Sequence, residues 1–172
     1  MSPLNFSRCS AALASETNHL ISFVSAQNRY NLLERDIRRD LIPACERLGM
    51  GILPFYPLAS GLLTGKYRRG EPPPTGTRLT SGIHFYEGVL DNADWDLIEG
   101  LTDFAAERGH TILELAIGWL ASQPAVACVM TGATHVDQIE QNAKSADWRL
   151  TPGEMRQVDE ILNRSQQIDV RA

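Results

Sequence analysis

Leu53-Pro-Phe-Tyr-Pro-Leu-Ala-Ser-Gly-Leu-Leu-Thr-Gly-Lys66 is a short apolar run that passes directly into a polar turn containing glycine. A second stretch of this kind, Thr131-Gly-Ala-Thr-His-Val-Asp-Gln-Ile-Glu-Gln-Asn142, follows the apolar run 125–130. Parallel α/β proteins bind phosphate groups and nucleotides at the carboxyl ends of their strands, where such turns occur. Both stretches therefore have the character of nucleotide-binding segments.

Hydrophobic periodicity predicts alternating strands and helices around these stretches. The predicted strands are 19–26, 51–55 and 125–130, and the predicted helices are 8–16, 36–48, 93–108, 111–123, 135–143 and one that opens at Thr151. Ser7 is the expected N-cap of the first helix, while Thr111-x-x-Glu114 and Thr151-x-x-Glu154 have the spacing of capping boxes. No strand runs into Gly-x-Gly-x-x-Gly, which disfavours a Rossmann domain. We interpret the chain as an α/β protein, a partial TIM (β/α)8 barrel in one domain over 1–172, with a long loop at about 57–92.

Composition is that of an ordinary globular protein and argues against several functional classes. The chain has 172 residues, 43% of them hydrophobic, and its net charge of -5 predicts no nucleic-acid partner. No apolar run approaches the roughly 20 residues that cross a bilayer, so we expect no membrane partner. The three cysteines are isolated, which predicts no metal site, and with no signal-peptide pattern at the start we expect a cytoplasmic protein.

The segment Gly61-Leu-Leu-Thr-Gly-Lys66 differs from a P-loop. Only three residues separate its glycines, and Tyr67 stands where Ser or Thr would hold magnesium, so nucleoside triphosphate hydrolysis is disfavoured. A glycine turn whose backbone N–H groups face a diphosphate remains a sensible interpretation. A plain turn from strand to loop is the alternative.

Five segments occur together in the order and approximate spacing of one known family. They are Asn5-Phe-Ser7, Gln27-Asn-Arg-Tyr-Asn31, Phe55 to Tyr67, Ala116-Ile-Gly-Trp-Leu120 and Gly132 to Asn142. From about Asn5 to Ile161 the chain resembles the aldo-keto reductases, from just after the fifth strand of their barrel to its C-terminus. The resemblance implies a nicotinamide-cofactor-binding part of an oxidoreductase that reduces aldehydes or ketones.

The resemblance also implies roles for individual residues. Asn5 and Gln27 match residues that hydrogen-bond the nicotinamide carboxamide, and Phe55 matches the aromatic that stacks on the nicotinamide ring. The pyrophosphate segment is matched by Pro57, Leu58, Ser60, Gly61 and Leu63, and the basic positions near the phosphates by Lys66 and Arg78. The adenosine half is matched by Gly132, Thr134, Gln138, Gln141 and Asn142. Plainer interpretations of these residues are core packing, solvated loop charges and an exposed helix face.

Departures from the family pattern bear on the cofactor. Leu4 stands where the family often has a hydroxyl residue, and Gly132 and Gln138 replace a Lys and an Arg that one branch uses to grip the 2′-phosphate. The expectation of NADP(H) over NAD(H) therefore rests on Arg78, Thr134 and Lys66.

The catalytic Asp, Tyr, Lys and His of the family belong to its early strands, which this sequence does not match. Its two lysines are Lys66, in the cofactor loop, and Lys144, and neither is a substitute for the catalytic lysine. We expect the chain alone to be inactive, and to act on a small carbonyl substrate only when the barrel is completed by self-association or by pairing with an N-terminal half. The alternatives are a non-catalytic NADP(H)-binding or assembly module that acts through a partner chain, and an unstable remnant without function.

Overall fold

The computed structural model describes residues 3–80, 82, 84 and 88–169. The chain divides into two compact units, which we call the sheet unit (residues 1–57 with 120–132) and the helical unit (residues 58–119 with 133–172). That both units belong to a single domain stays a prediction.

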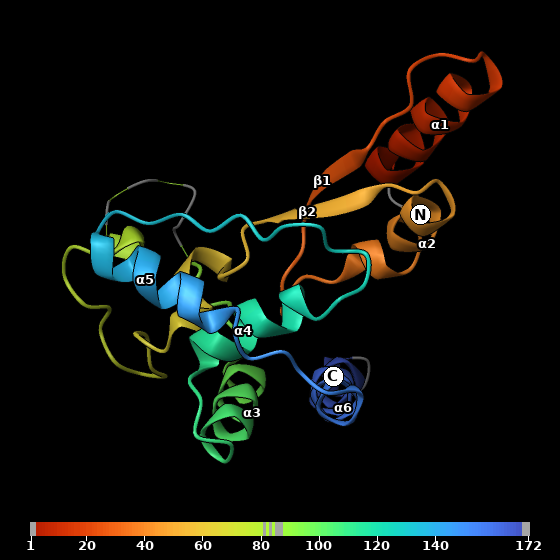
Figure 1. Ribbon diagram of the computed structural model, residues 1–172. Coiled ribbons are helices and arrows are strands. Elements are labelled where there is room, and N and C mark those ends of the chain that lie inside the picture. Colours follow the sequence, from red (N-terminus) through yellow and green to blue (C-terminus); the bar gives the residue numbers. More distant parts are fainter. Residues whose placement is uncertain (1–2, 81, 83, 85–87, 170–172) are drawn as a thin grey trace. The chain divides into compact units, whose positions relative to one another are not determined.

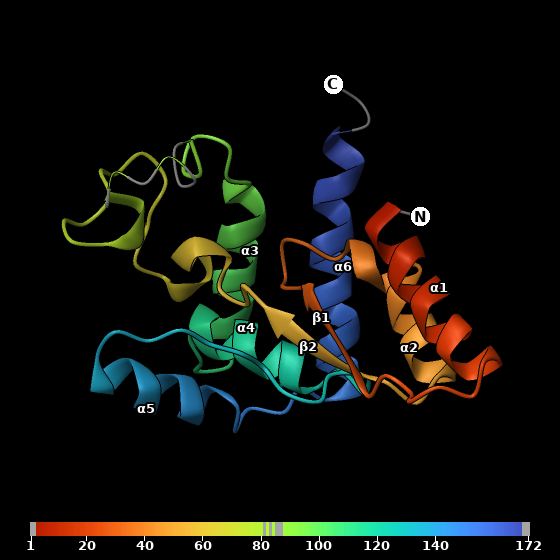
Figure 2. The ribbon, with the colours of Figure 1, turned by 90° about the horizontal axis from the view of Figure 1, so that it is seen from above.

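The sheet unit is built on two parallel strands, β1 (Ser25–Arg29) and β2 (Gly51–Phe55), which lie side by side in Figure 1. Helix α1 (Pro3–Thr17) precedes β1, and the short 3-10 helix η1 (Asp36–Arg38) and helix α2 (Leu41–Arg47) connect the two strands. Helix α2 packs against β2 and against α1, beside which it lies in Figure 2. Thus the predicted α/β class is confirmed, with a parallel sheet of two strands.

The start of the first helix and the extent of the second differ from the sequence-based expectation. Helix α1 begins at Pro3, so Ser7 lies inside it and the predicted N-cap is wrong. Proline suits the first turn of a helix because the N–H that it lacks has no helical acceptor there. The predicted helix 36–48 is divided into η1 and α2, and Gly49 follows α2 with a left-handed φ of 64°.

The first strand lies further along the chain than predicted. The apolar residues 19–24 suggested a strand over 19–26, but β1 starts at Ser25 and continues through polar residues to Arg29. Its partner decides this, because β2 begins at Gly51, opposite Ser25, and leaves the earlier residues without a strand to pair with in the described part of the chain. Leu20, Ile21 and Val24 are consequently exposed, by 63%, 94% and 80%.

The third predicted strand, 125–130, forms a single parallel bridge between Val126 and Ile52. Ile52 donates its N–H to the carbonyl of Ala125 at 2.7 Å and accepts from the N–H of Ala127 at 2.9 Å. The next donor of β2 on this side would be Pro54, which has no N–H. The Pro54 carbonyl still accepts from the Met130 N–H at 3.2 Å, but the alternation of donor and acceptor is broken at this residue. This is why the expected strand is a bridge.

The helical unit contains the predicted helices close to their expected bounds. They are α3 (Trp95–Ala106), α4 (Ile112–Ala121, of which 112–119 belong to this unit), α5 (Val136–Ser145) and α6 (Pro152–Asp169). Both capping boxes are confirmed: the amide and hydroxyl of Thr111 donate to Glu114 at 2.7 and 2.9 Å, and those of Thr151 donate to Glu154 at 2.7 Å each. Helix α3 packs against α6 (Figure 2).

The core of the helical unit consists of the apolar faces of its helices. The fully buried side chains include Leu63, Leu101, Leu115, Ile117, Trp119, Val158 and Leu162. Two short 3-10 helices, η2 (Ala59–Thr64) and η3 (Arg78–Thr80), lie in the predicted long loop. Every helix within residues 3–80, 82, 84 and 88–169 falls short of the length or the apolar character that a bilayer crossing demands.

Candidate functional site

The residues predicted to bind a cofactor are divided between the two units. Asn5, Gln27, Phe55, Pro57 and Gly132 belong to the sheet unit, and Leu58, Ser60, Gly61, Leu63, Lys66, Arg78, Thr134, Gln138, Gln141 and Asn142 belong to the helical unit. The backbone of Asn5 lies in α1 and that of Arg78 opens η3, while the side chains of these two residues lie outside the described part of the structure.

One face of the two-stranded sheet is open and carries Gln27 and Phe55. Successive residues of a strand point to opposite faces, and the register places Gln27 opposite Leu53 and Phe55 opposite Arg29 on the open face. The residues between them, such as Ala26 and Ile52, are buried. The aromatic ring of Phe55 is large and apolar, yet the residue is 40% exposed.

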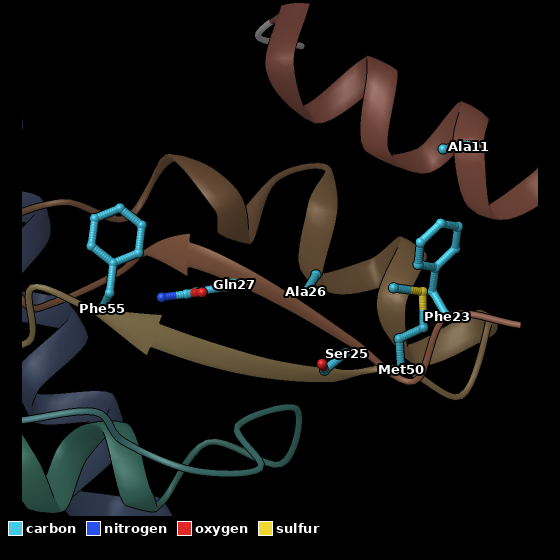
Figure 3. Close-up of a pocket in the computed structure, with 7 residues that line it drawn as sticks. All are labelled: Ala11, Phe23, Ser25, Ala26, Gln27, Met50 and Phe55. Atoms are coloured by element: carbon cyan, nitrogen blue, oxygen red, sulfur yellow. The ribbon is translucent and has the colours of Figure 1, made fainter.

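A cavity of about 580 Å³ lies within the sheet unit. Its lining residues are Ala11, Phe23, Ser25, Ala26, Gln27, Met50 and Phe55. Figure 3 shows Phe55 and Phe23 toward opposite ends, with Gln27 between them. The structure thus brings two of the predicted nicotinamide-binding residues to one cavity, where their amide and aromatic ring lie on the same sheet face.

Tyr56 turns the chain away from β2 in a conformation that is unusual for its residue type. Its φ is +64°, in the left-handed region, and it precedes Pro57, a position that favours extended backbone. Such strain costs about 1–3 kcal/mol per residue and persists only where the surroundings impose it. The side chain of Asn31 is one such constraint, because its Nδ2 donates to the Tyr56 carbonyl at 3.0 Å.

Three consecutive left-handed residues form the turn of η2. Ala59, Ser60 and Gly61 have φ values of 46°, 59° and 96°, and two of the three carry a Cβ that disfavours this conformation. The Gly61 N–H closes the turn on the Leu58 carbonyl at 2.8 Å. The predicted pyrophosphate segment is therefore a compact, strained turn with Ser60, Gly61 and Leu63 buried.

Lys66 packs directly over Gly61. A Cβ on Gly61 would lie 2.9 Å from Lys66 Cε and 3.0 Å from its Nζ. The ammonium group also lies 5.0 Å from the centre of the Tyr67 ring. Glycine at position 61 leaves the space that allows an exposed cation to lie against the turn.

Arg69 fixes the chain just beyond Lys66 to helix α3. Its Nε and Nη2 donate to the two carboxylate oxygens of Glu99 at 3.1 and 2.9 Å, and Nη2 also donates to Asp96. The hydrogen bond to Asp96 is the main reason that the pKa of Arg69 is raised above its ordinary value, and Glu99 acts in the same direction. These groups are exposed, so the contacts tie the chain after Lys66 to α3 only weakly.

The residues predicted for the adenosine half are only partly grouped. The N–H and hydroxyl of Thr134 donate to Gln138 Oε1 at 2.8 and 3.3 Å, which brings these two residues together at the start of α5. Gln141 is exposed, and Asn142 is buried in the helical unit. Gly132 is exposed and belongs to the sheet unit.

Three residues that lie beside predicted site residues are not themselves predicted: Tyr56, Asn31 and Arg69. For Asn31 there was a signal, since it closes the segment Gln27-Asn-Arg-Tyr-Asn31 that carries part of the family resemblance. For Arg69 there was none, because its acidic partners lie 27 and 30 residues away in sequence.

Comparison with known proteins agrees with these segments. The sequence profile of the aldo/keto reductase family matches residues 5–163. A Schizosaccharomyces pombe protein, provisionally named a voltage-gated potassium channel subunit beta, is 35% identical over 152 residues, which are 84% of this chain and 44% of that protein. An Arabidopsis thaliana protein of the same provisional name is 33% identical over 87% of this chain and 47% of its own length.

A third relative is an enzyme. The L-glyceraldehyde 3-phosphate reductase of Escherichia coli strain K12 is 31% identical over 142 residues, which are 79% of this chain and 40% of the enzyme. The chain thus spans a little under half the length of the curated relatives that it matches.

Proposed function

The chain belongs to the aldo/keto reductase family, and on this premise we propose that it is the nicotinamide-cofactor-binding C-terminal half of an oxidoreductase that reduces aldehydes or ketones. The observation that carries the proposal is the open sheet face, where the exposed ring of Phe55 and the amide of Gln27 line one cavity.

The chemistry of these side chains fits a nicotinamide. An exposed aromatic face can stack on a planar ring and exclude water from one side of it. The Gln27 amide has both a donor and an acceptor, which matches the donor and acceptor of a carboxamide. When bound, a reduced nicotinamide supplies a hydride, and the part of Phe55 is to fix which side of the ring faces the substrate.

The turn from Pro57 to Lys66 fits a diphosphate. Its left-handed residues support a role in anion binding, because backbone N–H groups in such turns can form an anion-binding concavity. The Gly61 and Leu63 N–H groups donate to the Leu58 carbonyl, so the proposed anion donors are other N–H groups of this turn. Lys66 adds a positive charge beside Gly61. We further propose NADP(H) in preference to NAD(H), with Arg78, Lys66 and Thr134 as the residues that favour the 2′-phosphate, and with Gln138, Gln141 and Asn142 around the adenosine.

The catalytic part of the proposal concerns a complete barrel. The residues that match the family include no equivalent of its catalytic Asp, Tyr, Lys and His, so we propose that this chain binds the cofactor and does not by itself reduce a carbonyl. Exposed aliphatic residues before β1 support pairing of this edge with an N-terminal half or with another copy of the chain.

Substitution of Phe55 tests the proposed nicotinamide site. We expect Phe55→Ala to weaken NADPH binding by about 0.5–1.5 kcal/mol or more, the scale of an aromatic pair beyond its buried area. Phe23→Ala is the matched control, because Phe23 lines the same cavity and is 51% exposed. Equal losses in the two variants would remove Phe55 from the nicotinamide site.

A second candidate function is a non-catalytic, cofactor-responsive assembly module. The relatives named as potassium channel subunits favour it, together with the exposed apolar residues beside β1. Supplying the N-terminal half of a relative in trans distinguishes the two candidates. NADPH oxidation with an aldehyde substrate supports the oxidoreductase half, whereas association that responds to NADPH without turnover supports the assembly module.

A further inference from the structure

A closed ring of four residues adjoins Phe55, which precedes one member in sequence and pairs with another across the sheet. We infer that Arg29, Asn31, Glu34 and Tyr56, called here the positioning ring, hold the backbone of Tyr56 left-handed and so orient the Phe55 ring toward a nicotinamide. The inference rests on the proposed function of Phe55. All four members belong to the sheet unit, and none of them is among the residues predicted above to bind a cofactor.

Asn31 is the buried member of the positioning ring. It is fully buried, with 0% of its surface exposed. Its Oδ1 accepts from the N–H groups of Leu33 and Glu34, both at 2.9 Å, and its Nδ2 donates to the Tyr56 carbonyl at 3.0 Å. One buried amide therefore shapes the loop after β1 and also holds the residue after β2, 25 positions away.

The side chain of Arg29 closes the positioning ring through its contacts with Glu34 and Tyr56. Arg29 Nε lies 2.9 Å from Glu34 Oε2, and the guanidinium carbon lies 4.1 Å from the centre of the Tyr56 ring. The side chains of Arg29 and Glu34 are 41% and 40% exposed, so water screens their ion pair. We therefore expect the buried contacts of Asn31 to contribute most of the restraint on Tyr56.

The restraint reaches Phe55 through one peptide bond. Tyr56 is left-handed, carries a Cβ and precedes a proline, so an unrestrained chain would adopt extended backbone at this position. Phe55 is the last residue of β2, and its carbonyl accepts a long hydrogen bond from the Tyr30 N–H at 3.4 Å. A change of φ at Tyr56 therefore displaces this end of the strand relative to Pro57. The expected result is a Phe55 ring that no longer lies against the nicotinamide.

The variant Asn31→Asp separates the two tasks of Asn31. Aspartate keeps the oxygen that accepts from Leu33 and Glu34, and at a pH where its buried carboxylate is ionised it has no donor for the Tyr56 carbonyl. We expect Asn31→Asp to lower NADPH affinity by about tenfold, the equivalent of one buried hydrogen bond. Binding of 2′-phospho-ADP-ribose, which lacks the nicotinamide, should change little.

A glycine at position 56 provides the rescue. Glycine adopts positive φ without the Cβ penalty, so a chain with Tyr56→Gly needs less restraint there. In the Tyr56→Gly background, Asn31→Asp should therefore cause a much smaller loss of NADPH affinity than it does in the wild-type chain.

The inference is tested by titrating four proteins with NADPH and with 2′-phospho-ADP-ribose. The proteins are the 172-residue wild-type chain, the two single variants and the double variant. Selective loss of NADPH binding in Asn31→Asp, reduced in the Tyr56→Gly background, supports it. Three results would each overturn the inference while the proposed function stands. They are an NADPH affinity of Asn31→Asp equal to that of the wild type, an equal loss of affinity for both ligands, and a loss of NADPH affinity that is as large in the Tyr56→Gly background as in the wild-type chain. A folded wild-type chain that binds neither ligand refutes the proposed function and the inference together.

Discussion

Replacing Gly61 by alanine tests whether the turn after β2 holds Lys66 for a phosphate. Gly61 has a φ of +96°, and a Cβ on it would lie 2.9 Å from Lys66 Cε and 3.3 Å from Tyr67 Cε2. The lysine end is flexible, so we expect the ammonium group to move away from the turn. The substitution thus displaces the proposed phosphate contact without removing its charge.

The substitution should lower both the folding stability and the NADPH affinity, and the two losses are measured separately. A left-handed residue with a Cβ costs about 1–2 kcal/mol of folding free energy. Loss of a charged hydrogen bond costs about 1.5–3 kcal/mol of binding, or roughly tenfold to more than a hundredfold in Kd. Gly70→Ala isolates the first cost, because Gly70 has a φ of +72° and, apart from its chain neighbours, no atom of the described residues lies within 4 Å of its added Cβ.

Urea unfolding and NADPH titration of the two variants complete the test. We expect both Gly61→Ala and Gly70→Ala to lose about 1–2 kcal/mol of stability, and only Gly61→Ala to lose about tenfold or more in NADPH affinity. Equal NADPH affinities in the two variants would refute the placement of Lys66 at a phosphate.

Three further predictions concern other parts of the molecule. Gly118→Ala should destabilise the chain by about 1–3 kcal/mol in urea unfolding, because the added Cβ would collide with the Trp148 carbonyl oxygen. Gly100→Ala in α3 is the control: the nearest atom to its added Cβ is 3.5 Å away, so the substitution should stabilise the chain by up to about 1 kcal/mol. The Thr151 amide and hydroxyl, which donate to Glu154, hold the pKa of that carboxyl below its ordinary 4.5. The stability contributed by the Glu154 charge is therefore present above pH 4.5 and is lost as the pH falls through the lower pKa of the folded state. The free energies of unfolding in urea of the wild type and Glu154→Gln should therefore become equal in acid. A difference that stays constant with pH would contradict this. Arg78→Ala should weaken NADPH more than NADH in parallel titrations, and equal losses would remove Arg78 from the 2′-phosphate site.

Local features of the structure could be predicted from sequence because their causes lie within a few residues. Both capping boxes follow from a threonine and a glutamate three residues apart, which place the carboxylate within reach of the cap N–H. Strand β2 was predicted at its observed bounds, 51–55. The turn after β2 was recognised as a distinct feature by its glycines, and its left-handed residues agree with that.

Features that depend on distant partners could not be predicted in this way. Strand β1 contains Gln27, Asn28 and Arg29, which no apolar pattern marks as a strand, and only their pairing with β2 makes them one. The expected strand 125–130 is reduced to a single bridge because Pro54 of the neighbouring β2 has no N–H to donate. The contact of Asn31 with Tyr56 likewise requires β1 and β2 to be adjacent first.

Titration of the 172-residue chain with NADPH and then with NADH, followed by cofactor fluorescence, tests the central claim most directly. A thermal unfolding curve of the same sample establishes that the chain is folded. The account predicts saturable binding with a lower Kd for NADPH than for NADH. A cooperatively folded chain that binds neither dinucleotide would contradict it.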